Sequence, residues 1–115
     1  MKTKKTPIYL NSNSRIQNAE IAELDNIPVY DGFPDYDKDA REIGKTISIE
    51  QKEDGIYADM VITDPDFIHK IKMQPCVGME LDEEIDQVKF THIALLPYGS
   101  NVDSNIPPIE FIQES

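Results

Sequence analysis

The chain has 115 residues and carries 22 acidic against 11 basic side chains, which gives a net charge of −11. This length suits one domain, and the charge repels phosphate backbones and anionic lipids, which argues against nucleic acid and membranes as partners. The single cysteine, Cys76, excludes an intramolecular disulfide and a cysteine-rich zinc site. Because no apolar run is long enough for a transmembrane helix or a signal peptide, we expect a cytoplasmic protein.

The predicted elements are mostly short strands. The 16 isoleucines and 5 valines outnumber the 5 leucines and 5 alanines, and β-branched side chains favour a pleated surface over a helix. A flexible basic segment over 1–6 is expected to precede a single domain over 7–115. In the first part of that domain the pattern predicts a polar acidic loop over 31–42, preceded by strands at 7–10, 15–24 and 27–30.

A hairpin in the middle of the chain is the clearest structural signal. Strands at 43–51 and 56–62 flank Glu53-Asp54-Gly55, where Gly55 can adopt a positive φ at little cost. In the second strand, alternation predicts one buried face made of Ile56, Ala58, Met60 and Ile62.

A short helix and a second pair of strands are predicted next. Asp64 suits the N-cap and Pro65 the first helical position of a helix near 65–72. Strands at 76–81 and 87–96 follow, joined by an acidic turn. Alternation places five side chains of the last strand on one face: Val88, Phe90, His92, Ala94 and Leu96.

Together these elements describe a mostly β protein. One more short strand is expected at 109–112, and the sequence contains no internal repeat. We therefore predict a β-rich α+β fold, either a small barrel or a strongly curved antiparallel sheet, with the one short helix near 65–72.

Three motifs occur in a suggestive order along the chain. Ile43-Gly44-Lys45-Thr46 opens a strand, Cys76-Val77-Gly78-Met79 opens another after the helix, and the strand after that contains Thr91-His92-Ile93-Ala94-Leu95-Leu96-Pro97. Over about residues 27–100, the chain thereby resembles the phage prohead protease superfamily, which shares the herpesvirus assemblin fold. Members of that superfamily cut scaffold and capsid precursors during head maturation.

The resemblance implies roles for individual residues. The nucleophile position, a serine in the family, falls on Cys76, and a thiol can replace a hydroxyl once it is deprotonated. The third triad position, which orients the base, falls on His92. The base histidine usually stands in a Gly-His-Pro setting, which here reads Gly32-Phe33-Pro34. Phe33 cannot take a proton, and the only other histidine, His69, has no counterpart in the motif.

The resemblance therefore implies a broken triad, and the loss of a triad member costs orders of magnitude in rate. A Cys76–His92 dyad would restore activity if the imidazole reached the sulfur. The structural alternatives are that Cys76 is a small buried apolar side chain and that His92 is a buried neutral histidine bonded to a neighbour.

Two acidic segments are candidate binding sites. Asp35, Asp37 and Asp39 match the start of a calcium loop, but Ala40 and Thr46 stand where such a loop needs glycine and glutamate. We therefore expect a solvated loop and neither a metal nor another cofactor. The run from Glu80 to Asp86 is expected to be a solvated turn or a contact for a basic partner surface.

Three functions remain open. The first is a phage or prophage head-morphogenesis protein with an impaired protease-like site, which binds capsid or scaffold segments, for instance by pairing them against a sheet edge. It would act in the cytoplasm of the bacterial host or in the virion, as a monomer or homo-oligomer. The second is an active minimal endopeptidase that uses Cys76 and His92. The third is a small acidic phage-encoded inhibitor that offers carboxylates to a basic host surface.

Overall fold

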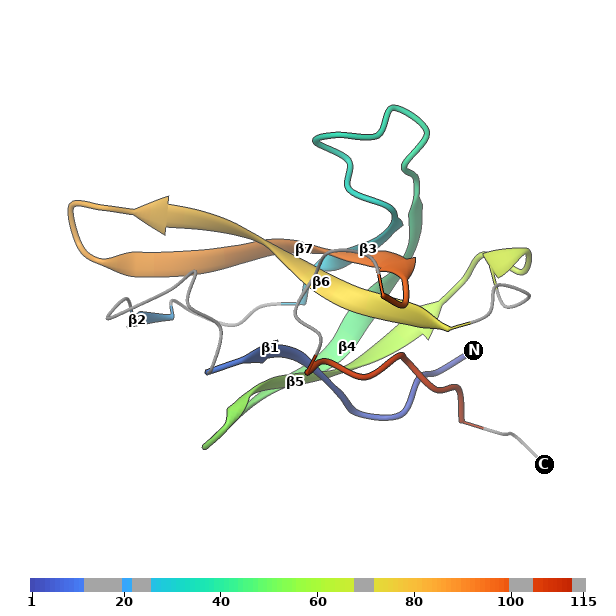
Figure 1. The fold of residues 1–115 in the computed structure, drawn as a ribbon, viewed down its shortest axis with the longest axis horizontal. Coiled ribbons are helices and arrows are strands. Elements are labelled where there is room, and N and C mark those ends of the chain that lie inside the picture. Colours follow the sequence, from blue (N-terminus) through green and yellow to red (C-terminus); the bar gives the residue numbers. More distant parts are fainter. Residues whose placement is uncertain (12–19, 22–25, 68–71, 100–104, 113–115) are drawn as a thin grey trace.

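One mixed β-sheet accounts for nearly all of the regular structure. The computed structural model describes residues 1–11, 20–21, 26–67, 72–99 and 105–112. Figure 1 shows the strands that these residues form: β1 (Thr6–Leu10), β2 (Glu20–Ile21), β3 (Pro28–Asp31), β4 (Glu42–Lys52), β5 (Gly55–Ile62), β6 (Met73–Asp82) and β7 (Gln87–Pro97). Their order in the sheet is β1-β5-β4-β3-β7, with β6 on the other side of β7 and β2 beside the start of β7.

The sheet curls until β6 returns close to β1, so the molecule is a nearly closed, barrel-like single domain. This confirms the mostly β prediction. Most of the strand pairs are antiparallel, whereas β2 and β3 both run parallel to β7. The β4–β5 hairpin and β6 lie between β3 and β7 in the chain, so β7 returns to β3 in the same direction.

The predicted helix falls largely outside the described residues, which omit 68–71. The residues at its expected start, 64–67, are described. The Asp64 carboxylate accepts a hydrogen bond from the N–H of Asp66 at 3.0 Å, and Phe67 is buried. This is the bond that an N-cap aspartate makes. No helix in the described part of the chain is long and apolar enough to cross a membrane. Most of the strand predicted at 15–24 also lies outside it, apart from β2.

The predicted β4–β5 hairpin is present, but Gly55 plays a different part in it from the one expected. The turn consists of Glu53 and Asp54, and Gly55 is already a strand residue without a positive φ. A Cβ on Gly55 would lie 2.1 Å from the carbonyl oxygen of Tyr9, so glycine is required there because β1 approaches closely. The Tyr57 hydroxyl donates to Asp54 at 2.7 Å, which raises the pKa of Tyr57 above its ordinary value.

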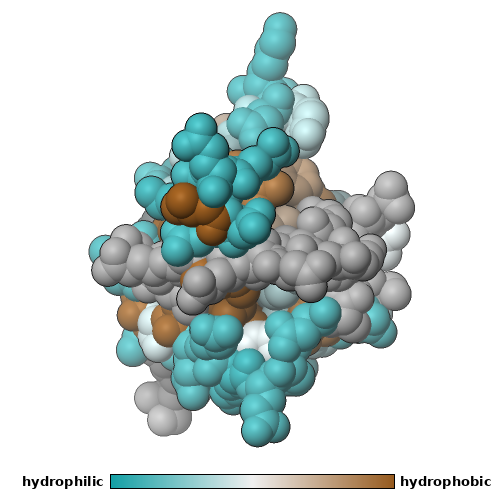
Figure 2. All heavy atoms as spheres, turned by 90° about the vertical axis from the view of Figure 1, so that its left-hand side faces the viewer, coloured by the Kyte–Doolittle hydropathy of each residue, from teal (hydrophilic) through white to brown (hydrophobic). Residues whose placement is uncertain are grey.

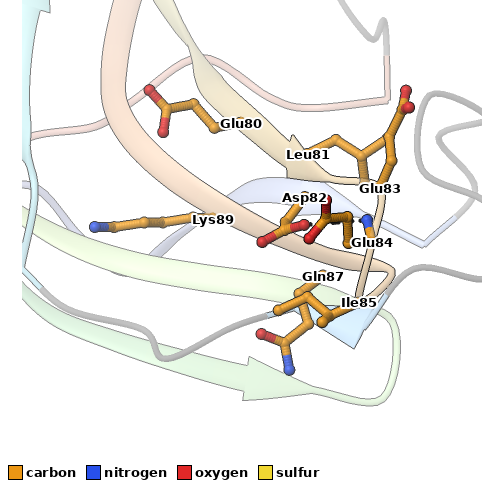
Figure 3. A pocket seen from close by; sticks show the side chains of 8 residues that line it. All are labelled: Glu80, Leu81, Asp82, Glu83, Glu84, Ile85, Gln87 and Lys89. Atoms are coloured by element: carbon orange, nitrogen blue, oxygen red, sulfur yellow. Dashed lines mark hydrogen bonds between the residues drawn. The ribbon is translucent and has the colours of Figure 1, made fainter.

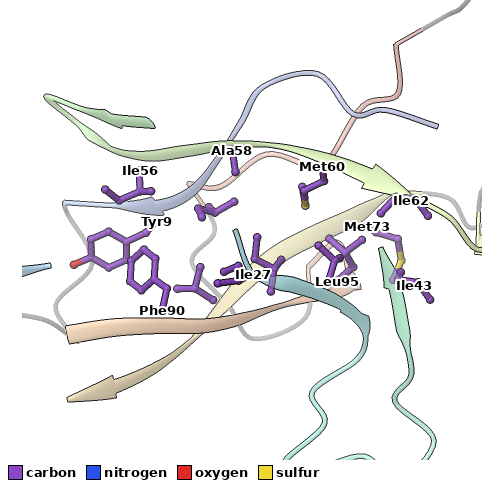
Figure 4. Packing of buried hydrophobic residues seen from close by; sticks show 14 of the residues in the cluster. Tyr9, Ile27, Ile43, Ile56, Ala58, Met60, Ile62, Met73, Phe90 and Leu95 are labelled. Atoms are coloured by element: carbon purple, nitrogen blue, oxygen red, sulfur yellow. The ribbon is translucent and has the colours of Figure 1, made fainter. Parts of the chain in front are cut away.

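The core fills the inside of the curled sheet, and Figure 4 shows its packing. Alternation along β5 points one side of that strand inward, as the sequence predicts, and its four predicted residues are all buried: Ile56, Ala58, Met60 and Ile62. Tyr9 from β1 meets Phe90 from β7 across the interior, with ring centroids 5.8 Å apart. Strands from both ends of the sheet order therefore share one core.

The segments 1–4 and 109–112 both make backbone contacts with the rest of the fold. Thr3 is 1% exposed and exchanges hydrogen bonds with the backbone of Met60. Residues 109–112, expected as a strand, form one bridge, between Phe111 and Thr3. Their backbone bonds reach Lys2 and Lys4 on one side and Met73 on the other. The C-terminal segment therefore spans the gap between the N-terminal segment and β6.

Candidate functional site

A bulge in β7 decides which way the candidate catalytic residues point. Gly78 of β6 pairs with His92, but the next residue, Met79, pairs with Phe90, so Thr91 is an extra residue in β7. An extra residue reverses the alternation of a strand. Before the bulge the core receives Val88 and Phe90, and after it the core receives Ile93 and Leu95. The prediction that His92 shares a face with Val88 and Phe90 was therefore wrong, because His92 points to the outer face of the sheet.

The three positions that the motifs single out lie together on this outer face. Cys76 pairs with Ala94, and Gly78 pairs with His92, so Cys76 and His92 project from the same side of β6 and β7 at neighbouring pairs. Phe33, in the loop that follows β3, reaches over the same strands, and its ring lies 6.1 Å from that of His92, edge to face. The other histidine of the chain, His69, lies outside the described residues.

The imidazole of His92 is enclosed by neighbouring residues on several sides. Its ring lies against the backbone of Gly78, where an added Cβ would be 2.1 Å from Cε1 of His92. The Tyr30 ring closes another side at 5.9 Å, also edge to face. Sequence reasoning missed Tyr30 and Gly78 as members of this site. The Gly-containing motif at 76–79 was a usable signal for Gly78, whereas Tyr30 comes from a separate strand.

Only one of the two ring nitrogens of His92 has a hydrogen-bond partner in the described structure. The side chain is 8% exposed, and its Nδ1 is hydrogen-bonded to the Thr91 hydroxyl at 3.0 Å. The other ring nitrogen, Nε2, is buried without a hydrogen-bond partner among the described residues. A buried polar atom without a partner is rare in folded proteins and marks a strained or functional position. His92 is therefore the most unusual polar side chain in the described part of the molecule.

Cys76 is 4% exposed and contributes no hydrogen bond to His92, since Nδ1 bonds Thr91 and Nε2 has no partner in the described structure. A thiol acts as a nucleophile when a base lies within hydrogen-bond reach and the substrate can approach it. Within the described residues, the ring nitrogens of His92 are not hydrogen-bonded to the thiol, and Cys76 is buried. The Cys76–His92 dyad stays a prediction that requires the imidazole to turn.

The acidic loop between β3 and β4 supports this site instead of forming a separate one. Asp37 accepts a hydrogen bond from the N–H of Asp39 at 2.9 Å, and the Tyr36 ring lies 6.0 Å from that of Phe33. Within the described residues, no group of three or more acidic, histidine or cysteine side chains is placed to hold a metal ion, and Asp35, Asp37 and Asp39 form none. The loop positions Phe33 over His92.

A second candidate surface lies at the tip of the β6–β7 hairpin, where the sequence predicts an acidic turn. An open hollow of about 640 Å³ lies there, and Figure 3 shows the side chains that line it. We call its lining the hairpin tip: Glu80, Leu81, Asp82, Glu83, Glu84, Ile85, Gln87 and Lys89. Leu81 and Ile85 are 55% and 59% exposed, and sequence reasoning missed both. Their signal was a pair of aliphatic residues standing alone within an acidic run.

The described part of the chain thus offers two surfaces of different character. Cys76 and His92 are buried, and the Phe33 ring lies against that of His92, whereas the hairpin tip is open, acidic and partly apolar. Comparison with known proteins finds no family model, no curated protein and no solved structure that matches this chain.

Proposed function

We propose that this chain is a phage or prophage head-morphogenesis protein whose protease-like site is impaired and which acts by binding capsid or scaffold segments. The motif order along the sequence supports the proposal. So does the gathering of Cys76, His92 and Phe33 on one face of a barrel-like sheet, since these are the three positions at which the resembled family has its triad. The bacterial host cytoplasm is the proposed place of action.

The observation that carries the proposal is the contact between Phe33 and His92. A phenyl ring occupies the place implied for the base, 6.1 Å from the imidazole, and it can neither accept nor deliver a proton. Cys76 on this face is 4% exposed, so a peptide carbonyl would reach the sulfur only after neighbouring side chains moved. A phenyl ring at the position implied for the base, together with a buried residue at the position implied for the nucleophile, favours binding over cleavage.

One observation favours an active cysteine endopeptidase as the second candidate. Nε2 of His92 is buried without a partner in the described structure, on the same face as Cys76. An unsatisfied buried group costs about 1–3 kcal/mol, and rotation of the ring toward the thiol would remove that cost. In this second candidate Cys76 is the nucleophile and His92 the base.

Alkylation of Cys76 separates the two candidates, and the chain has only one thiol, so the signal is unambiguous. We expect iodoacetamide to label the folded protein only after urea unfolds it, because the sulfur is buried. Rapid labelling of the folded protein at about pH 6, where an ordinary thiol with a pKa near 8.5 is protonated, would instead favour the peptidase.

The binding half of the proposal needs the capsid and scaffold precursors of the same phage or prophage. We expect a complex in sedimentation velocity, no new cleavage products in mass spectrometry, and unchanged binding by the Cys76→Ala variant. Cleavage by the natural chain that disappears in Cys76→Ala would contradict the proposal, and so would the absence of any complex.

A further inference from the structure

The β6–β7 hairpin extends past the end of the core. In Figure 1 it reaches further to the left than β1, β4 and β5. Along β6, burial falls from buried residues at Met73–Val77 to exposed ones at Glu80–Asp82. Leu81 pairs with Val88, so the two share a face, yet Val88 is 2% exposed and Leu81 55%. The core-facing side of the sheet therefore continues beyond the core and presents an aliphatic side chain to solvent.

The charge at this end is strongly one-sided. Residues 80–89 contain five acidic side chains and a single lysine, Lys89. The salt bridges of the described residues join Lys4 to Glu110, Lys5 to Glu50 and Arg41 to Asp64, so none involves the hairpin tip. Figure 2, which views this end of the molecule, shows a small hydrophobic patch surrounded by hydrophilic side chains. Uncompensated like charges around exposed apolar side chains suit a surface that is covered by a partner.

The hollow is wide and open, which indicates the kind of partner. Its volume of about 640 Å³ would accept more than one apolar side chain. The carboxylates around it are spread along the hairpin, and in the described structure they form no group that could hold a single metal ion. Several separate cations fit such an arrangement better than one cation does. Nucleic acid and anionic lipid are repelled by the same charges.

We propose that the hairpin tip is a docking surface for a cationic protein segment that inserts apolar side chains beside Leu81 and Ile85 while its lysines or arginines meet the surrounding carboxylates. The inference rests on the proposed function insofar as the chain acts by binding a protein. It adds the surface used and the chemistry of the segment bound. Interfaces with an apolar centre and a charged rim have this composition.

The test uses two synthetic peptides and matched variants of the full chain. One peptide is an amphipathic helix of lysine and leucine, and the other has every leucine replaced by glutamine. The tip-acid variant carries Glu80→Gln, Glu83→Gln and Glu84→Gln, which spares Asp82 because its carboxylate accepts the Glu84 N–H. Its control, Asp35→Asn, Asp39→Asn and Glu42→Gln, removes the same charge from the loop after β3 and the start of β4, and it spares Asp37 because that carboxylate accepts the Asp39 N–H. A third variant carries Leu81→Ser and Ile85→Ser.

We expect fluorescence anisotropy to show that the tip-acid variant and the Leu81→Ser, Ile85→Ser variant each bind the lysine–leucine peptide at least about tenfold more weakly than the natural chain. The loop control should change the affinity less than about threefold, because a distant exposed charge acts only through screened attraction. The glutamine peptide should bind weakly to every form. All substituted side chains are exposed, so circular dichroism should show the same fold throughout.

Equal weakening by the two acid variants would overturn the proposal, because binding would then follow net charge alone. Unchanged affinity in Leu81→Ser, Ile85→Ser would overturn it as well. The capsid and scaffold precursors separate this result from the proposed function. If precursors bind the natural chain and the tip variants equally, the docking surface is wrong and the function stands. If the peptide binds at the tip while no precursor binds, the surface stands and the function is wrong.

Discussion

At the scale of single residues, the contact between Gly78 and His92 explains why glycine stands in β6. The imidazole lies where the side chain of any other residue would begin, since an added Cβ would be 2.1 Å from Cε1. The ring cannot move aside freely, because Tyr30 and Phe33 pack against it edge to face. Glycine is therefore needed here for close approach of a side chain.

Gly78→Ala should accordingly destabilise the protein. Forcing one methyl group into a packed site costs about 1–3 kcal/mol, and here the His92 ring and its two aromatic neighbours must all shift. The midpoint of urea unfolding, followed by circular dichroism, measures the loss.

The matched control is the same substitution in a His92→Ala background, where the obstructing ring is absent. The cost of Gly78→Ala should fall to a few tenths of a kcal/mol there, which makes the coupling between the two positions large. An equal cost in both backgrounds would show that the ring is not what the methyl group meets.

The sequence indicated which residues could form this site, but it did not show how the fold brings them together. The motifs singled out Cys76, His92 and Phe33, and the structure places the three on one face. Tyr30 reaches the site through a parallel pairing of β3 with β7, which joins residues far apart in the chain. No local periodicity encodes such a pairing, so its side chains stay invisible until the sheet order is known.

At the scale of elements, the Thr91 bulge shows where alternation fails as a guide. The strand reads as alternating up to Phe90, and from His92 to Leu95 every residue is buried. The sequence predicted burial on both faces of this second half, and the structure confirms it. It could not place the extra residue, because a half-exposed threonine fits either face.

Deleting Thr91 should cost little more than truncating its side chain. The deletion removes the bulge and joins Phe90 to His92, so both keep their pairing with β6, and His92 still points outward and Ile93 inward. We expect a loss within about 1 kcal/mol of that of Thr91→Ala. Thr91→Ala keeps the bulge and removes only the hydrogen bond to Nδ1 of His92, which costs about 1 kcal/mol.

Chemical denaturation of the two Thr91 variants provides the comparison, with near-ultraviolet circular dichroism reporting on tertiary packing. If the deletion variant lost its tertiary packing while Thr91→Ala kept it, Thr91 would not be a simple extra residue in β7, and the outward placement of His92 would lose its explanation.

At the scale of the whole molecule, the fold class follows from composition and alternation, whereas closure of the barrel depends on both chain ends. β-branched residues and the β4–β5 hairpin sufficed to predict a curled sheet. The pairing of 109–112 with 2–4 was not predictable, because it joins segments about a hundred residues apart in sequence and neither has a strong pattern. Thr3 looks like part of a polar tail, yet it is 1% exposed.

Shortening the chain tests the role of the C-terminal segment in this closure. A chain that ends after Pro108 loses three backbone hydrogen bonds, to Met73, Lys2 and Lys4, and the partly buried side chains of Ile109 and Phe111. Their burial and hydrogen bonds predict a loss of about 2–4 kcal/mol. A chain that ends after Ile112 keeps all of these contacts and is the matched control.

Because the segment joins the two edges of the sheet, amide exchange at Thr3 should rise in the shorter chain while exchange in the β4–β5 hairpin changes little. A uniform rise across the sheet would mean instead that the barrel unfolds as one unit when its closing segment is removed.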